Sequence, residues 1–164
     1  MEQIKPLTVH HYENERVVTL QPKQRQALKV LAWLLFVGYS VCLVYWMFRG
    51  FGRTAHIGLQ FNLVPLNTIF GYIFNLNTHN LGTTIINLAG NIGVFMPFGV
   101  LLPYLFPGLR RYSLFLTWFT ASVIVLELLQ TILRVGIGDI DDVILNGIGA
   151  SLGFMVYRLC SQKM

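Results

Sequence analysis

Four long apolar segments dominate the pattern of the chain, at residues 28–48, 81–106, 112–133 and 142–160. The first is uncharged after Lys29, the second carries no charge, and the only charge in the third is Glu127. A helix of about 20 apolar residues crosses the hydrocarbon core of a bilayer. The pattern predicts an all-α fold, a polytopic membrane helix bundle with four transmembrane helices.

A further uncharged stretch, residues 57–76, is long enough to be considered as a fifth span. A fifth crossing would move Arg110, Arg111 and Arg158 to the outer face, against the excess of basic residues found on cytoplasmic loops. Pro65 and several asparagines also fit poorly in a helix that faces lipid. We therefore expect a re-entrant or interfacial segment on the outer face, with both termini in the cytoplasm.

Composition agrees with a membrane protein, because 54% of the residues are hydrophobic and only 12% are charged. A soluble domain carries about 25% charged residues. The pattern divides the chain into a polar cytosolic tail, residues 1–27, and a transmembrane domain, residues 28–164. The net charge of +5 is expected to reflect basic residues on the cytoplasmic side rather than a nucleic-acid partner.

Cysteine and histidine positions give no sign of a metal site or of a disulfide framework. Cys42 and Cys160 fall in separate apolar segments, and neither belongs to a CxxC motif or a Cys/His spacing. His10 and His11 lie in the polar tail with no further ligand nearby and are expected to be solvated. The sequence predicts neither a metal nor a cofactor.

Polar residues inside the apolar segments recur at helical spacings. Glu127, Gln130 and Arg134 stand at i, i+3 and i+7, which places them on one helix face. Asn87 and Asn91 are separated by four residues, as are Asp142 and Asn146. In the four-span topology Glu127 lies roughly 10 Å below Arg134, and Asn91 roughly 15 Å below the outer end of its helix. All of these side chains are therefore expected to converge in the outer half of the bilayer.

An ionisable residue at this depth is costly unless it is paired, and it marks a candidate functional site. Glu127 is expected to contact Asn91, Gln130 or Arg134, and Arg134 to pair with Asp139 or Asp142. The predicted ligand-binding residues are Asn87, Asn91, Glu127, Gln130, Arg134, Asp139, Asp142 and Asn146. The alternative is that this network only holds the helices together, as polar side chains do in membrane bundles. The sequence Gly149-x-x-x-Gly153 predicts close helix packing.

The order of these motifs resembles the VanZ-like family. The resemblance runs from Asn62-Leu-Val-Pro65 through Asn87-Leu-Ala-Gly-Asn91-Ile-Gly-Val-Phe95-Met-Pro97 to Glu127-Leu-Leu-Gln130, and ends with Asp139-Ile-Asp-Asp142-Val-Ile-Leu-Asn146. It covers about residues 30–160. Leu66 stands where the family usually has phenylalanine. The resemblance implies a bacterial cytoplasmic-membrane protein, related to proteins of resistance to teicoplanin, a glycopeptide antibiotic with an acyl chain.

Three functions compete at this stage. The first is binding of a membrane lipid or another amphiphile at the outer leaflet. The second is an enzyme acting on a lipid or a cell-wall precursor, with Glu127 or Asp142 as the candidate general base. No Ser, Cys or His lies in the cluster, and its nearest hydroxyls are Thr83, Thr84 and Thr131, so an enzyme is the less favoured interpretation. The third is an accessory subunit whose polar network is structural.

Overall fold

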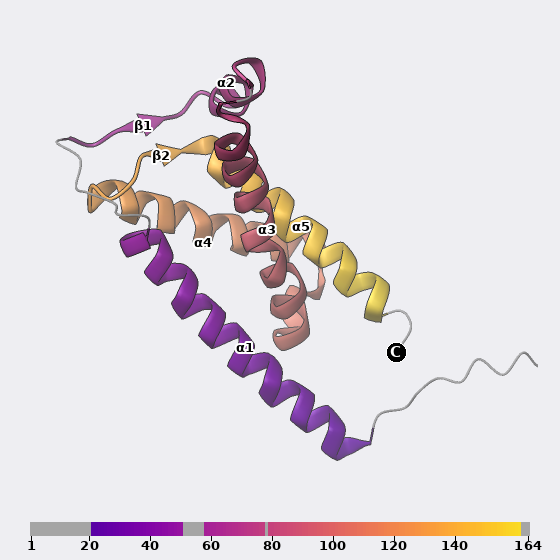
Figure 1. Ribbon diagram of the computed structural model, residues 1–164. Helices are drawn as coiled ribbons and strands as arrows, with labels where there is room; N and C mark the ends of the chain where they lie inside the picture. Colours follow the sequence, from indigo (N-terminus) through magenta and orange to yellow (C-terminus); the bar gives the residue numbers. More distant parts are fainter. Residues whose placement is uncertain (1–20, 51–57, 78, 162–164) are drawn as a thin grey trace, which may run out of the picture.

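The computed structural model describes residues 21–50, 58–77 and 79–161. The predictions for His10, His11 and most of the polar tail lie outside these residues. The elements, in chain order, are α1 (Pro22–Arg49), β1 (Phe61–Asn62), α2 (Asn67–Phe74), α3 (Leu81–Leu105), the 3₁₀ helix η2 (Pro107–Arg110), α4 (Tyr112–Ile132), β2 (Gly138–Asp139) and α5 (Ile140–Ser161) (Figure 1).

The four predicted spans are confirmed as four helices, α1, α3, α4 and α5, each long and apolar enough to cross a membrane. α1 begins at Pro22, six residues before the predicted start of its span at residue 28. Proline suits this position because the first helical residue needs no N–H donor. The helices alternate in direction, so the ends of α1 and α4 lie at the same end of the bundle as the beginnings of α3 and α5 (Figure 1). We call this end the polar end.

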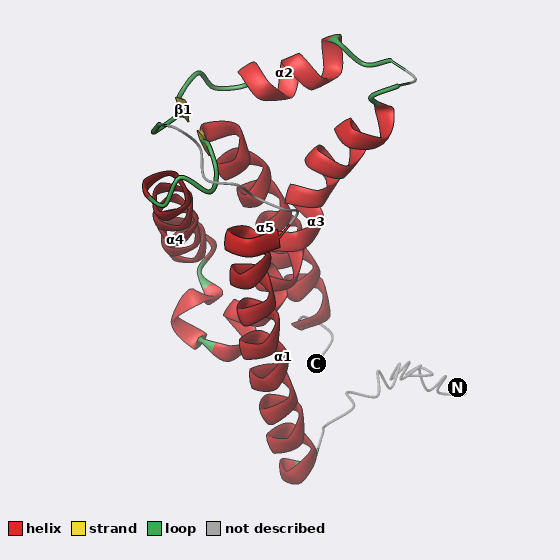
Figure 2. Cartoon of the chain, turned by 60° about the vertical axis from the view of Figure 1, so that its left-hand side comes forward, coloured by secondary structure: helices red, strands yellow, loops and turns green. Residues whose placement is uncertain are grey.

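Between α1 and α3, the described residues 58–77 form no spanning helix, in agreement with the sequence prediction. α2 has only eight residues, about 12 Å of helix, and it lies across the polar end (Figure 2). The strand β1 pairs in parallel with β2, with Phe61 opposite Gly138. Many described side chains of this segment are apolar and exposed, including Leu63, Val64 and Phe74, which is typical of a surface that meets lipid.

α3 and α5 form the closest helix pair because glycines let their backbones touch. A Cβ atom added at Gly149 would collide with the carbonyl oxygen of Ile92, and one at Gly153 with that of Met96. In the opposite direction, a Cβ at Gly99 would collide with the carbonyl oxygen of Ala150. The close packing predicted for Gly149 and Gly153 is therefore confirmed.

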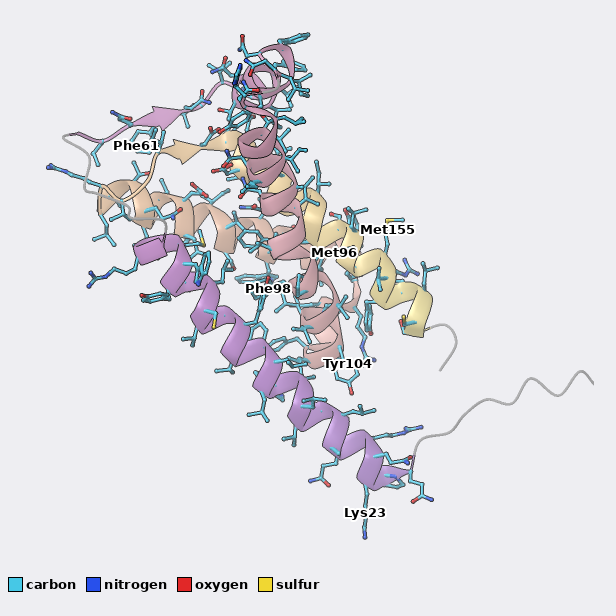
Figure 3. All side chains as sticks on the ribbon, in the orientation of Figure 1. Lys23, Phe61, Met96, Phe98, Tyr104 and Met155 are labelled. Carbon is cyan, nitrogen blue, oxygen red and sulfur yellow. The ribbon has the colours of Figure 1, made fainter. Side chains whose placement is uncertain are left out.

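A core of aromatic side chains joins α3, α4 and α5 below the polar end. Phe115 and Phe154 are almost fully buried, with ring centroids 4.9 Å apart, and Phe95 packs edge-on against Phe119 at 5.8 Å. Phe98 projects from α3 toward α1 (Figure 3), which meets the core more loosely. In α1 only Ala32 is buried, so most of this helix is left to face lipid.

Candidate functional site

A cavity of about 820 Å³ lies at the polar end, surrounded by the four long helices and covered by β1 and α2. Its apolar wall includes Leu43, Trp46 and Met47 from α1, and Leu88 and Phe95 from α3. Its polar wall consists of Asn62, Thr68, Tyr72, Asn87, Asn91, Glu127, Gln130, Asp139, Asp142 and Asn146. Seven of the eight predicted site residues therefore line one cavity, although they come from three helices and the strand β2.

A short hydrogen bond on the wall joins α3 to α5. Asn91 Nδ2 donates a hydrogen bond to Asp142 Oδ1 over 2.6 Å. Asp142 lies in the first turn of α5, where a carboxylate is stabilised by the positive end of the helix dipole. The bond fixes the position of the Asp142 side chain on the cavity wall.

Glu127 and Gln130 are both buried on α4, 7% and 4% exposed. Gln130 Nε2 donates to the backbone carbonyl of Met47 over 2.6 Å. That carbonyl belongs to the last turn of α1, where carbonyls lack partners within the helix. Of the two amides predicted to contact Glu127, Gln130 donates one hydrogen bond to α1 and Asn91 donates one to Asp142.

Arg134 lies apart from this cluster, contrary to the sequence prediction. α4 ends at Ile132, and Arg134 follows with a left-handed φ of 59°. Its N–H donates to the Thr131 carbonyl and the N–H of Val135 to that of Gln130, which is the hydrogen-bond pattern of a Schellman helix end. The turn takes Arg134 off the helix face. Its side chain is exposed, absent from the cavity wall, and in no ion pair within the described part of the chain.

Asp141 is a functional candidate that the sequence reasoning did not select. Its carboxylate is 0% exposed and accepts three backbone N–H groups at the start of α2: from Leu66 at 2.5 Å, Thr68 at 2.8 Å and Ile69 at 3.1 Å. Asp141 thus caps a helix about 70 residues away rather than its own. The only signal in the sequence was that three aspartates exceed the needs of one helix start.

Asp139 fastens the same cover at a second point. Its Oδ1 accepts the Asp141 N–H over 2.9 Å, and its Oδ2 accepts the Thr68 hydroxyl over 2.6 Å. Thr68 Oγ1 in turn accepts a hydrogen bond from Asn62 Nδ2 over 2.7 Å. The β1–α2 cover is held to the start of α5 by side chains that also line the cavity, so its position and the shape of the cavity are linked.

Two buried polar atoms have no hydrogen-bond partner among the described residues, Thr84 Oγ1 and Asn146 Oδ1. Thr84 lies outside the cavity wall, whereas Asn146 is part of it. Buried polar atoms are nearly always hydrogen-bonded, and exceptions need an explanation. For Asn146 the cavity itself offers one, because a ligand could supply the missing donor.

The ionisable side chains of acid type on the described wall have no basic counterpart there. Glu127, Asp139 and Asp142 line the cavity, and its described lining includes no lysine, arginine or histidine. The hydroxyls on the wall belong to Thr68 and Tyr72. The threonines expected near the cluster add no hydroxyl to the described wall. Thr131 is fully buried and donates to the Glu127 carbonyl, and Thr84 is buried outside the wall. The Thr83 side chain is not described. Such a wall can hold hydrogen-bond donors and cations.

Comparison with known proteins agrees with the motifs. A protein named Protein VanZ, from Enterococcus faecium, is 31% identical over 110 residues, and the alignment covers 65% of each chain. No solved structure matches the chain. The family model for VanZ/LLP1 matches residues 36–161, which extend from the middle of α1 to the end of α5 and include the whole described cavity wall. The chain is therefore a member of the VanZ/LLP1 family of membrane proteins.

Proposed function

We propose that this protein binds an amphiphile at the outer leaflet of the bacterial cytoplasmic membrane. The polar part of the ligand occupies the cavity, and its acyl chain lies against the apolar wall supplied by α1 and α3. The observation that carries the proposal is the convergence of seven polar side chains from distant segments on one cavity. Small-molecule sites are mostly apolar concavities of about 300–1,000 Å³ with a few convergent polar groups.

The distribution of basic residues supports the outer-leaflet position. Six of the eight described lysines and arginines lie at or near the end away from the cavity: Lys23, Arg25, Lys29, Arg110, Arg111 and Arg158. Only Arg49 and Arg134 lie at the polar end. Because basic residues accumulate on cytoplasmic loops, the polar end faces outward and both termini are cytoplasmic.

The charge of the wall favours a ligand with a cationic or neutral polar part. An anionic headgroup would lie beside three carboxylates, whereas an amine, hydroxyl or amide would donate to them. Acylated peptides and acylated amino sugars have these groups. A glycopeptide antibiotic with an acyl chain belongs to the same chemical class, and the family resemblance makes it one ligand to test.

Binding of two ligands with the same chain tests this proposal. Dodecylamine and dodecyl sulfate are titrated into the protein in phosphatidylcholine nanodiscs, with empty nanodiscs as the reference. We expect saturable binding of the amine, and binding at least tenfold weaker for the sulfate. Arg134→Gln should change neither, because Arg134 is exposed outside the cavity. A preference for the sulfate that Arg134→Gln abolishes would refute the proposal and favour an enzyme acting on lipid phosphates.

A further inference from the structure

Asn146 is the one side chain that lines the cavity, is almost fully buried, and has a hydrogen-bonding atom left without a partner among the described residues. It is 2% exposed, and its unpartnered atom is the acceptor Oδ1. The terminal torsion of an asparagine side chain is soft. Rotation about this torsion can therefore turn Oδ1 toward a donor in the cavity.

The surroundings of Asn146 add negative charge to this acceptor. Asp142 lies four residues earlier on α5, so it is on the same face of the helix, and Asn91 holds its carboxylate in place. Glu127 faces the cavity from α4. A carboxylate has about four lone-pair sites on its two oxygens. Each of these carboxylates can therefore accept several hydrogen bonds at once.

The geometry points to an ammonium subsite, formed by Asn146 Oδ1 and the carboxylates of Asp142 and Glu127, which takes the primary ammonium group of the ligand. This inference rests on the proposed function and specifies the ligand. A primary ammonium group has three N–H donors and a positive charge, so its donors match in number the three side chains of the subsite. A hydroxyl has one donor and no charge, and a quaternary ammonium group has charge without a donor.

A metal ion suits the same atoms less well. Within the described residues, no three His, Cys, Asp or Glu side chains are grouped so that they could hold a metal ion. Magnesium and calcium need six or more oxygen ligands at short, defined distances. Ammonium accepts looser geometry, because its donors rotate on a flexible stem.

The test compares ligands that differ only in the donors on nitrogen. Dodecylamine, dodecyltrimethylammonium and dodecanol are titrated into the protein in phosphatidylcholine nanodiscs at neutral pH. We expect the primary amine to bind about tenfold more tightly than the quaternary one, the effect of one hydrogen bond to a charged group. Dodecanol should bind more weakly than the primary amine.

Variants at the subsite identify the acceptor. Asn146→Leu removes Oδ1 at similar volume, and it should abolish the preference for the primary amine while binding of the quaternary ligand shows that the fold survives. Asn146→Asp keeps an acceptor and should keep the preference. Thr84→Val is the matched control, because it removes the other buried unpartnered oxygen from a residue outside the cavity wall. It should leave all three ligands unaffected.

A competition experiment tests whether the ammonium group belongs to a membrane lipid or to another ligand. Phosphatidylethanolamine has a primary ammonium group, and phosphatidylcholine has a quaternary one. If a lipid is the natural ligand, replacing half of the phosphatidylcholine by phosphatidylethanolamine should weaken dodecylamine binding by competition. Unchanged binding would indicate an acylated peptide or amino sugar, and the subsite would stand.

The binding results distinguish failure of the ammonium subsite from failure of the proposed amphiphile binding. Equal binding of primary and quaternary ligands, or a preference that persists in Asn146→Leu, overturns the ammonium subsite and leaves amphiphile binding in place. Failure of every dodecyl ligand to bind overturns the proposed function as well. A primary-amine preference that also disappears in Thr84→Val would show a general effect of packing, and it too would overturn the subsite.

Discussion

At the scale of single residues, the three aspartates at the start of α5 have three different partners. Asp139 binds the Thr68 hydroxyl, Asp141 caps α2, and Asp142 accepts from Asn91. The buried Asp141 therefore holds the cover of the cavity, whereas Asp142 belongs to the cavity wall. Identical substitutions at neighbouring positions should thus have different effects.

Asp141→Asn should loosen the cover without removing ligand preference. The amide places N–H donors opposite the N–H groups of α2, and one lost acceptor of this kind costs about 2 kcal/mol. Local opening at residues 66–69 should then allow about thirtyfold faster amide exchange, measured by hydrogen–deuterium exchange in nanodiscs. Asp142→Asn is the control, and it should weaken amine binding while exchange at residues 66–69 stays unchanged. The reverse pattern would show that the roles are wrongly assigned.

Substitutions at Glu127 distinguish a ligand-binding site from a polar network that only holds the helices together. Glu127→Gln removes the charge at constant size and should weaken dodecylamine binding about tenfold while the protein still folds. Glu127→Leu should also fold, because it replaces a buried charge by an apolar side chain, and it should lose the same affinity. If Glu127→Leu kept full binding, the cluster would only hold the helices together.

Helical spacing made part of this site predictable. Pairs such as Asn87 and Asn91 keep one face of a helix wherever that helix packs, so their convergence followed from the topology. The prediction failed for Arg134 because the helix ended before it, which periodicity cannot show. It also missed Asp141, because its partners are backbone N–H groups of a distant segment, and these leave no side-chain pattern in the sequence.

At the scale of elements, the four spans were predictable because each is a long apolar stretch, and the helices end close to the predicted residues. The pairing of β1 with β2 was not predictable, since two residues on each side make no periodic signal. The closest packing is between α3 and α5, and it depends on those glycines that lie against the backbone of the other helix. Gly149 contacts backbone, whereas Gly147 has nothing near the position of an added Cβ.

Substitution of these two glycines by alanine should therefore have different effects on the stability of the protein. Gly149→Ala places a methyl group against the Ile92 carbonyl and should destabilise the protein by about 1–3 kcal/mol. Gly147→Ala, on the same helix, meets open space and should be neutral or slightly stabilising. Thermal unfolding in detergent, followed by circular dichroism, measures both. Equal melting temperatures would contradict the close contact between α3 and α5.

At the scale of the whole molecule, the proposal depends on which face of the membrane the polar end meets. The proposed orientation has the polar end outside, and single-cysteine labelling checks this in a background in which Cys42 and Cys160 are replaced by serine. Asn77→Cys should react with an impermeant maleimide in intact cells. Arg110→Cys should react only after permeabilisation, and its labelling from outside would reject the four-span orientation.

In the proposed complex, the amine of the amphiphile lies in the cavity at the polar end. Photo-crosslinking tests it most directly, with a dodecylamine that carries a diazirine on the carbon next to the head group and adducts located by mass spectrometry. We predict adducts on wall residues such as Leu88, Phe95 and Leu145, competed by unlabelled dodecylamine and strongly reduced in Asn146→Leu. Adducts confined to lipid-facing residues such as Trp118 and Leu159, with none on the wall, would contradict the account.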